Sequence, residues 1–268
     1  MDTSNVKIGF IGFGGMASAI CDGLLCKQVI SPSNIYACAK NWDKLRANCE
    51  ARGINACDSA GKVAEASDLV VVGVLPFQVE DVVKAIAGEL KGKPIFSIAY
   101  GIDYDRYVSI LGEGYNHIST IPNTPIAVGE GIIIAEERHS LTPEQLELFE
   151  SVFGQISSIE YFARPQMSLG GAGAGAAPAF VDVFIEALAD GLVKNGLTRA
   201  KAYSIVPQML VGSARYFMES GKHPGELKDN VCSPGGTTIE GISALEECGF
   251  RYAVIHAIDS VIAKKPTT

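Results

Sequence analysis

The sequence predicts an α/β protein: a doubly wound, mainly parallel sheet over residues 1–163, followed by an all-helical domain over residues 164–268. In the first part, short apolar strands alternate with helical segments across short connections, which is typical of a parallel sheet. A glycine-rich turn joins the first strand to the first helix. After Arg164-Pro165 the strand patterns stop, and helical periodicity continues to the end.

Composition and charge narrow the classes of function. The chain has 268 residues, of which 47% are hydrophobic and 19% are charged, which is enough apolar material for a buried core. A net charge of −8 argues against a nucleic-acid partner. The first residues carry no signal segment, and no apolar run approaches the roughly 20 residues of a membrane span. We therefore expect a cytoplasmic protein without a membrane partner.

Cysteine and histidine usage predicts reduced thiols and no metal site. The seven cysteines form no C-x-x-C pair, and the four histidines lack the spacing of metal ligands. We expect most of the cysteines to be buried as small apolar residues.

The strands and helices of the first part follow from apolar runs and from residues that begin and end helices. The run from Leu69 to Val74 is continuous and fits a strand buried on both faces. Asp58 is expected to cap a short helix that ends at Ala66, Pro76 to open a helix reaching about Leu90, and Thr142 to start a capping box. The other predicted strands are residues 6–11, 34–39, 53–56, 94–98, 115–121, 131–135 and 157–161, and the other helices are residues 16–27 and 43–52.

The turn after the first strand has the spacing G-x-G-x-x-A, at Gly12, Gly14 and Ala17. Gly12 permits a sharp turn, Gly14 lets a pyrophosphate approach the backbone, and Ala17 lets the helix pack close to the strand. The amides and positive end of that helix favour phosphate. This is the fingerprint of a Rossmann dinucleotide site, although an ordinary strand-to-helix turn is the alternative. The candidate cofactor-binding residues here are Gly12, Phe13, Gly14, Gly15, Met16 and Ala17.

Further cofactor contacts are expected in the loops that follow the other strands, because ligands of such folds bind beyond the carboxyl ends of the strands. The candidates are Ala39, Lys40, Val74, Leu75, Pro76 and Ala99. The second strand ends without the carboxylate that usually selects NAD, and Lys40 suits the extra phosphate of NADPH. We therefore favour NADPH and keep NADH possible; in the alternative interpretation, Lys40 is an ordinary surface lysine.

The second part predicts about five helices. Residues 170–178 could be a flexible linker, but helical spacing of apolar residues follows them, so we favour a close-packed helix start. These helices lack long charged faces, so another subunit is expected to bury part of their surface. Within this part, the turn from Ser233 to Thr238 precedes a helix and offers open amides and three hydroxyls, which suits a carboxylate. A simple turn with helix caps is the alternative.

Residues 229–246, DNVCSPGGTTIEGISALE, resemble the signature of the pyrroline-5-carboxylate reductase family. The match extends to residues 223–228 and 249–251, to residues 186–191, to the sequence PNTP at residues 122–125, and to the glycine turn. The resemblance implies NAD(P)H-dependent reduction of the cyclic imine 1-pyrroline-5-carboxylate to L-proline. It also implies a Rossmann domain followed by a helical dimerisation domain, in a homodimer that can assemble into a decamer.

The resemblance also implies roles for individual residues. Thr238 would be catalytic by hydrogen-bonding the ring nitrogen of the imine, together with Ser233. The substrate-binding residues would be Val231, Gly235, Gly236, Thr237, Thr238 and Asn123, and Asn230 would contact the cofactor.

Several positions depart from the pattern of the family: Leu75, Tyr100, Ser119, Ala176, Ala177 and Phe180. They keep two other hypotheses open. The chain could reduce a different cyclic or linear imino acid, or it could be a catalytically silent regulator that binds NAD(P).

Overall fold

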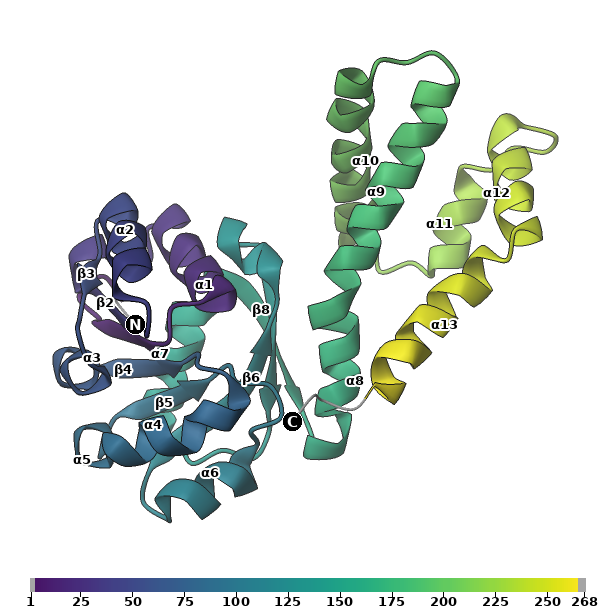
Figure 1. Ribbon diagram of the computed structural model, residues 1–268. Coiled ribbons are helices and arrows are strands. Elements are labelled where there is room, and N and C mark those ends of the chain that lie inside the picture. Colours follow the sequence, from purple (N-terminus) through teal and green to yellow (C-terminus); the bar gives the residue numbers. More distant parts are fainter. Residues whose placement is uncertain (1–2, 265–268) are drawn as a thin grey trace. The chain divides into compact units, whose positions relative to one another are not determined.

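The computed structural model describes residues 3–264, which form two compact units. One unit runs to Pro178, and the other runs from Ala179 to Lys264 (Figure 1). The domain boundary predicted at residue 163 stays a prediction. No helix among residues 3–264 combines the length and the apolar character that crossing a membrane requires.

The first unit is built on one eight-stranded sheet, which confirms the predicted doubly wound fold. All neighbouring strands are parallel except β6 and β7. Every residue of β1 and β4 is buried, as continuous apolar runs require. In spatial order the strands are β3 (Asn55–Ala56), β2 (Ile35–Cys38), β1 (Ile8–Ile11), β4 (Leu69–Val72), β5 (Pro94–Ser97), β6 (Asn116–Pro122), β7 (Gly131–Glu136) and β8 (Ser157–Phe162).

The register places the ends of four central strands level with one another. Ile11, the last residue of β1, pairs with both Cys38 and Val72, and Val72 pairs with Ser97. These four residues end β1, β2, β4 and β5. The loops that carry the candidate cofactor residues therefore leave the sheet at one edge.

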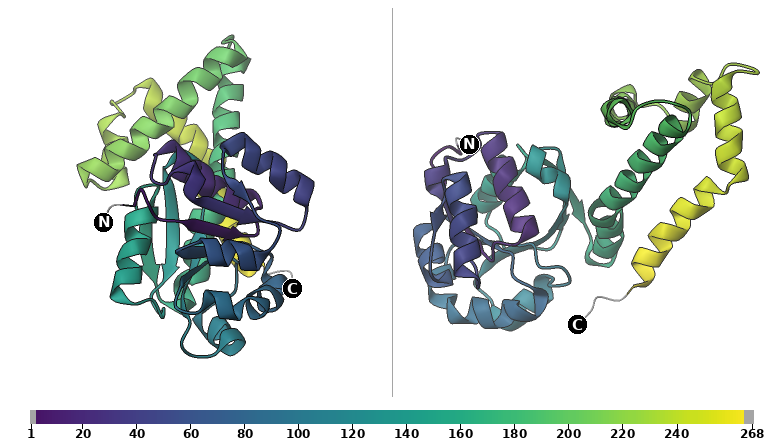
Figure 2. Two further views of the ribbon diagram at one scale, coloured as in Figure 1. Left: turned by 90° about the vertical axis from the view of Figure 1, so that its left-hand side faces the viewer. Right: turned by 45° about the horizontal axis from the view of Figure 1, so that its top comes forward.

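Helices cover both faces of this sheet, each over its own apolar core (Figure 2). One core takes residues from α1 and α7, and the other from α3, α4 and α6. The helices of the first unit before residue 164 are α1 (Gly15–Cys26), α2 (Trp42–Arg52), α3 (Ala60–Ala66), α4 (Val79–Ala85), α5 (Ala87–Leu90), α6 (Tyr104–Leu111) and α7 (Pro143–Phe153), with 3-10 turns η1 (Pro32–Asn34), η2 (Pro76–Gln78) and η3 (Thr124–Val128).

Three local predictions were wrong or incomplete, and one was confirmed. Ser59, not Asp58, caps α3, because its hydroxyl accepts the Lys62 N–H at 3.4 Å. The helix expected after Pro76 is broken into η2, α4 and α5. Helix α6, which Asp103 caps, was not predicted. The capping box at Thr142 is present at the start of α7.

The glycine-rich segment near residue 170 is helical, which confirms the close-packed interpretation. It comprises η4 (Arg164–Gln166), α8 (Met167–Gly171) and a π-helical turn, η5 (Ala172–Ala176), that continues into α9 (Ala177–Lys194). A Cβ on Gly170 would lie 2.9 Å from Ile134, and one on Gly171 would lie 3.0 Å from Ile121. These glycines therefore let α8 approach the sheet closely.

The unit from Ala179 onward consists of the rest of α9 and four further helices within the described chain. They are α10 (Arg199–Ser220), α11 (Pro224–Asn230), α12 (Thr237–Glu247) and α13 (Phe250–Ala263). Gly249 precedes α13 in the left-handed conformation, at φ 73°, and separates it from α12.

All seven cysteines are free thiols. The expectation that most are buried was wrong, since three are buried, two are partly exposed and two are exposed. They are, in that order, Cys21, Cys38 and Cys49; Cys57 and Cys232; and Cys26 and Cys248.

Candidate active site

The glycine turn after β1 leaves no room for a side chain at its first position. Gly12 has a φ of 90°, and a Cβ there would lie 2.7 Å from the backbone of Gly73. The Gly12 N–H donates a hydrogen bond to the Cys38 carbonyl at 3.0 Å. The turn is therefore fixed between the loops that follow β2 and β4, and it requires glycine.

The next two glycines face open space instead. A Cβ on Gly14 or Gly15 would meet no atom of the described chain within 4 Å. Gly14 is the N-cap of α1, where no described side chain caps the helix and no acidic residue lies in the first turn. Unbonded amides, the positive end of a 12-residue helix and free space together fit a pyrophosphate. These residues therefore suit a dinucleotide.

Other residues of the fingerprint have structural roles. Ala17 is buried, and its Cβ lies 3.5 Å from the place where a Cβ on Gly73 would be, which is the close helix–strand packing predicted for it. The Phe13 side chain is also buried and packs edge-on against Phe10, with ring centroids 5.7 Å apart. Phe13 therefore offers a ligand mainly its backbone. Met16 is half-buried.

The loops after β2 and β4 supply exposed groups at the same edge. Lys40 is exposed, and Ala39 before it is half-buried. The side chain of Asn41 accepts the Lys44 N–H at 3.0 Å and so caps α2. After β4, Val74 is half-buried, whereas Leu75 and Pro76 are exposed. A cationic Lys40 at this edge suits a phosphate.

Two buried hydroxyl groups of β6 anchor the loop after β5 through hydrogen bonds to its backbone. The Ser119 hydroxyl donates to the Ile102 carbonyl at 2.8 Å, and the Thr120 hydroxyl donates to the Ser97 carbonyl at 2.9 Å. Ala99 lies buried between these anchor points. Ser119, one of the departures from the family pattern, therefore fixes the loop that carries Ala99.

A buried carboxylate supports the same loop, and the sequence analysis missed it. Glu136 is 1% exposed and accepts the Tyr104 N–H at 2.8 Å. Burial raises the pKa of Glu136 above its ordinary value. A polar residue at the end of an otherwise apolar strand, residues 131–135, was the signal that could have identified it.

Asn123 lies at the end of β6 and is buried. Its side-chain oxygen accepts the Ile132 N–H at 2.9 Å, which ties η3 to β7. The side-chain amide group is what Asn123 can offer to a ligand.

The hydroxyl-rich turn of the second unit has a defined geometry. The Gly236 N–H donates to the Ser233 carbonyl at 3.0 Å, and Gly235 has a φ of 66°, which favours glycine. Gly236 is the N-cap of α12, where no described side chain caps the helix. The open amides at this helix start suit a carboxylate.

The remaining candidates of the second unit lie along the same stretch of chain. Thr237 and Thr238 form the first turn of α12, and their side chains are exposed, as is that of Ser233. Asn230 ends α11, and Val231 follows it; both are exposed. The candidates between Asn230 and Thr238 are therefore exposed, except Gly236, which is partly exposed.

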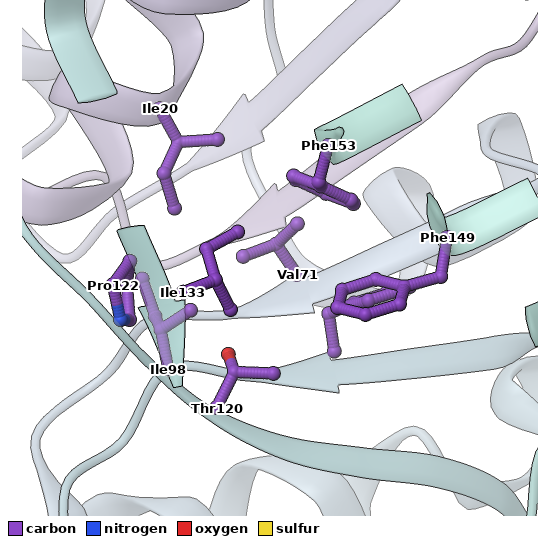
Figure 3. A pocket seen from close by; sticks show the side chains of 9 residues that line it. Ile20, Val71, Ile98, Thr120, Pro122, Ile133, Phe149 and Phe153 are labelled. Carbon is purple, nitrogen blue, oxygen red and sulfur yellow. The ribbon is translucent and has the colours of Figure 1, made fainter. Parts of the chain in front are cut away.

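The cavity of the sheet core is lined by apolar side chains apart from Thr120, so it offers no charged group to a phosphate or a carboxylate (Figure 3). Its one polar side chain, Thr120, already donates to Ser97. Its lining residues are Ile20, Val71, Phe96, Ile98, Thr120, Pro122, Ile133, Phe149 and Phe153. No cluster of three metal-ligating side chains occurs within residues 3–264.

Comparisons with known proteins cover nearly the whole chain. Residues 7–101 match the family described as NADP oxidoreductase, coenzyme F420-dependent, and residues 165–267 match the family described as pyrroline-5-carboxylate reductase dimerisation. The pyrroline-5-carboxylate reductase of Treponema pallidum is 39% identical, over 96% of this chain and 99% of its own. That of Escherichia coli is also 39% identical, over 96% of each chain. A crystal structure of Plasmodium falciparum pyrroline carboxylate reductase with NADP bound is 30% identical, with a TM-score of 0.87 and 97% of each chain covered.

Proposed function

The chain belongs to the pyrroline-5-carboxylate reductase family, and on that premise we propose that it reduces the C=N bond of 1-pyrroline-5-carboxylate to give L-proline. It is an oxidoreductase of proline biosynthesis that uses NADPH. The observation that carries this conclusion is the similarity to reductases over nearly the full length of the chain.

The residues of the first unit fit NADPH, which supplies the hydride. The turn at Gly12 would hold the pyrophosphate at the open face of Gly14, and Lys40 would hold the 2′-phosphate. The buried anchors Ser119 and Thr120 would keep the Ala99 loop in one conformation. A cofactor held in one orientation removes much of the entropic cost of bringing donor and acceptor together.

The hydroxyl-rich turn of the second unit would hold the substrate. The open amides at the start of α12 would bind its carboxylate, with Gly235, Gly236 and Thr237 around it. The hydroxyl of Thr238 would donate to the imine nitrogen, which becomes more basic as the carbon is reduced. Ser233 would assist as a second hydroxyl.

We propose that the working form is a homodimer that can assemble into a decamer, and that it is located in the cytoplasm. The support for oligomer formation is the match of residues 165–267 to a dimerisation family. The location is supported by the seven free thiols, which persist in reducing compartments.

A second substrate is favoured by one specific observation. Tyr100 follows Ala99 and is 46% exposed, and its ring lies 3.6 Å from the position of a Cβ on Gly171. Tyr100 is a departure from the family pattern next to the candidate residue Ala99, so its ring would change which cyclic imine the site accepts. A six-membered cyclic imine is therefore the alternative substrate.

The test is NADPH oxidation by the purified protein with 1-pyrroline-5-carboxylate, beside a six-membered cyclic imine and a linear imino acid. We expect the highest kcat/KM for the five-membered ring. Higher kcat/KM for another imine would reassign the substrate. NADPH binding without turnover of any imine would leave only a regulatory role.

A further inference from the structure

Two cysteines stand side by side at the edge of the sheet where the cofactor is expected. Cys38 is the last residue of β2, and Cys57 follows the last residue of β3. The two strands are parallel, with Ala37 paired with Ala56. The Cys57 N–H continues the ladder by donating to the Ala37 carbonyl at 2.8 Å. Cys38 and Cys57 are therefore the next pair in register.

Both side chains lie on the same face of the sheet. Cys38 belongs to the apolar core on the α3 side, and Cys57 packs against that core. The alternate residue Ala37 belongs to the core on the opposite face, as the pleat requires. Neighbouring strands lie about 4.8 Å apart, which is within the Cα separation that a disulfide spans.

The two thiols differ in access. Cys38 is 8% exposed, whereas Cys57 is partly exposed, so a soluble oxidant reaches Cys57 first. Burial raises the pKa of Cys38 to about 11. Burial also raises the pKa of Cys57; the charge of Asp58 raises it further, whereas the charge of Lys62 lowers it. Since the thiolate is the reactive form, oxidation requires sustained exposure to the oxidant.

A backbone shift at Cys38 would displace the glycine turn, because a hydrogen bond joins the two. The Cys38 carbonyl accepts the Gly12 N–H, and Lys40 lies two residues further along the chain. A disulfide brings its Cβ atoms to about 3.8 Å, closer than the roughly 4.5–5.5 Å between paired residues of neighbouring strands, so the backbone shifts at Cys38, at Cys57 or at both. A shift at Cys38 would therefore disturb the Gly12 turn, which packs closely against the Gly73 backbone.

We propose that Cys38 and Cys57 are a redox-sensitive pair, and that the disulfide between them weakens the binding of NADPH. The effect on NADPH rests on the proposed function, whereas the formation of the disulfide does not. Hydrogen peroxide oxidises the Cys57 thiol to a sulfenic acid and releases one water. The Cys38 thiol then attacks that sulfur and releases the second water. Two thiols are oxidised to one disulfide, and one peroxide is reduced to two waters.

The experiment treats the full-length protein with hydrogen peroxide, blocks the remaining thiols, and maps the linked peptides by mass spectrometry. NADPH affinity is measured in parallel by nicotinamide fluorescence. We expect a Cys38–Cys57 link and a roughly tenfold weaker affinity, the size of one lost charge-assisted hydrogen bond to phosphate. Dithiothreitol should restore the reduced peptides and the affinity.

Two variants of the partly exposed cysteine and one control define the outcome. Cys57→Ser and Cys57→Ala should keep NADPH affinity and lose its sensitivity to peroxide, whereas Cys248→Ser, which changes an exposed thiol of the other unit, should respond like the unmodified protein. A link from Cys57 to Cys49 instead, or a Cys38–Cys57 link without a change in affinity, would overturn the inference. Failure of the reduced protein to bind NADPH would refute the proposed function, while the peptide map would still report on the disulfide.

Discussion

The two units of the chain place their apolar side chains in opposite ways. The unit that ends at Pro178 buries most of its large apolar residues in two cores on either face of a sheet. Among residues 179–264, the buried apolar residues are Ala189, Ala202 and Val206 alone. The large apolar residues exposed there include Val183, Ile205, Met218, Val231, Tyr252 and Ile255.

This contrast distinguishes stability that comes from a core within the unit from stability that comes from contact with a partner. A sheet covered on both faces makes its own core, whereas helices with apolar residues exposed along them need a partner surface to exclude water. The match of residues 165–267 to a dimerisation family supports oligomer formation, which would provide such a surface. The first unit therefore folds around its own buried residues, whereas we expect the second to be stabilised by assembly.

The largest effect is expected from a charge placed on an apolar face of the second unit. Ile255→Asp in α13 would bury an unpaired carboxylate on assembly, which costs several kcal/mol, so the oligomer should dissociate and activity should be lost. Val128→Asp in the first unit is the matched control, because both side chains are 61% exposed. Light scattering after size exclusion reports the mass of each variant. Dissociation of both variants, or of neither, would remove the contrast between the units.

The next effect concerns the chemistry assigned to the second unit. Thr238→Ala removes the proposed proton donor, so kcat should fall about 100-fold while NADPH affinity and the melting temperature stay unchanged. Thr238→Ser keeps a hydroxyl and should recover most of the loss. Steady-state kinetics with separate NADPH titrations provide the measurement. Equal activity of the alanine and serine variants would exclude a role for the hydroxyl.

Two glycines of one turn sharpen the comparison within the first unit. Gly14→Val adds a side chain to open space at a φ of −88°, so the melting temperature should hold while NADPH binding is lost. Gly12→Val places a side chain against the Gly73 backbone at a φ of 90°, so it should destabilise the fold by about 2 kcal/mol or more. Thermal melts and fluorescence titration distinguish the two. Equal destabilisation by both variants would contradict the inference that the space beside Gly14 is open.

The sequence predicted features that depend on neighbouring residues better than contacts between residues that lie far apart in the chain. Apolar runs identified β1 and β4, and the spacing of Gly12, Gly14 and Ala17 identified the tight turn between β1 and α1, because each depends on neighbouring residues. Phosphate binding at that turn stays a prediction. Glu136 was missed, because its partner, the Tyr104 N–H, lies 32 residues away.

Tertiary contacts also determine whether an individual side chain has a structural role or is available to a ligand. Phe13 lies within the fingerprint, yet its ring belongs to the core, because Phe10 on β1 packs against it. Ser119 was treated as a departure from a family pattern, yet its hydroxyl fixes the loop at Ile102. In both cases the partner that decides the role could not be inferred from local spacing.

The first unit also contains a titratable group in its core, which gives its stability a pH dependence. His117 is 2% exposed, and its ring stacks between Tyr104 and Tyr107 at centroid distances of 5.0 and 4.8 Å. Burial lowers the pKa of His117 to about 4 in the folded chain, against about 6.5 when unfolded. The unfolded chain therefore binds the proton more tightly, and stability present above pH 6.5 is lost as the pH falls toward 4.

The expected loss is about 3 kcal/mol between these pH values, because one pKa unit corresponds to about 1.4 kcal/mol. Denaturant unfolding at several pH values measures it. His117→Gln should flatten that part of the profile, whereas His256→Gln, which changes an exposed histidine of the other unit, should keep it. The same slope in all three proteins would assign the loss to other groups.

The smallest effect concerns the choice of cofactor at the edge of the first unit. Lys40→Ala should weaken NADPH binding about tenfold and leave NADH binding unchanged, because only NADPH carries the 2′-phosphate. Lys44→Ala removes the same charge from an exposed position in α2, so it controls for the general field of the protein. Fluorescence titration of both cofactors gives the ratio of affinities. If Lys44→Ala shifted that ratio as much as Lys40→Ala, the selection would arise from the summed charge of the edge and not from Lys40.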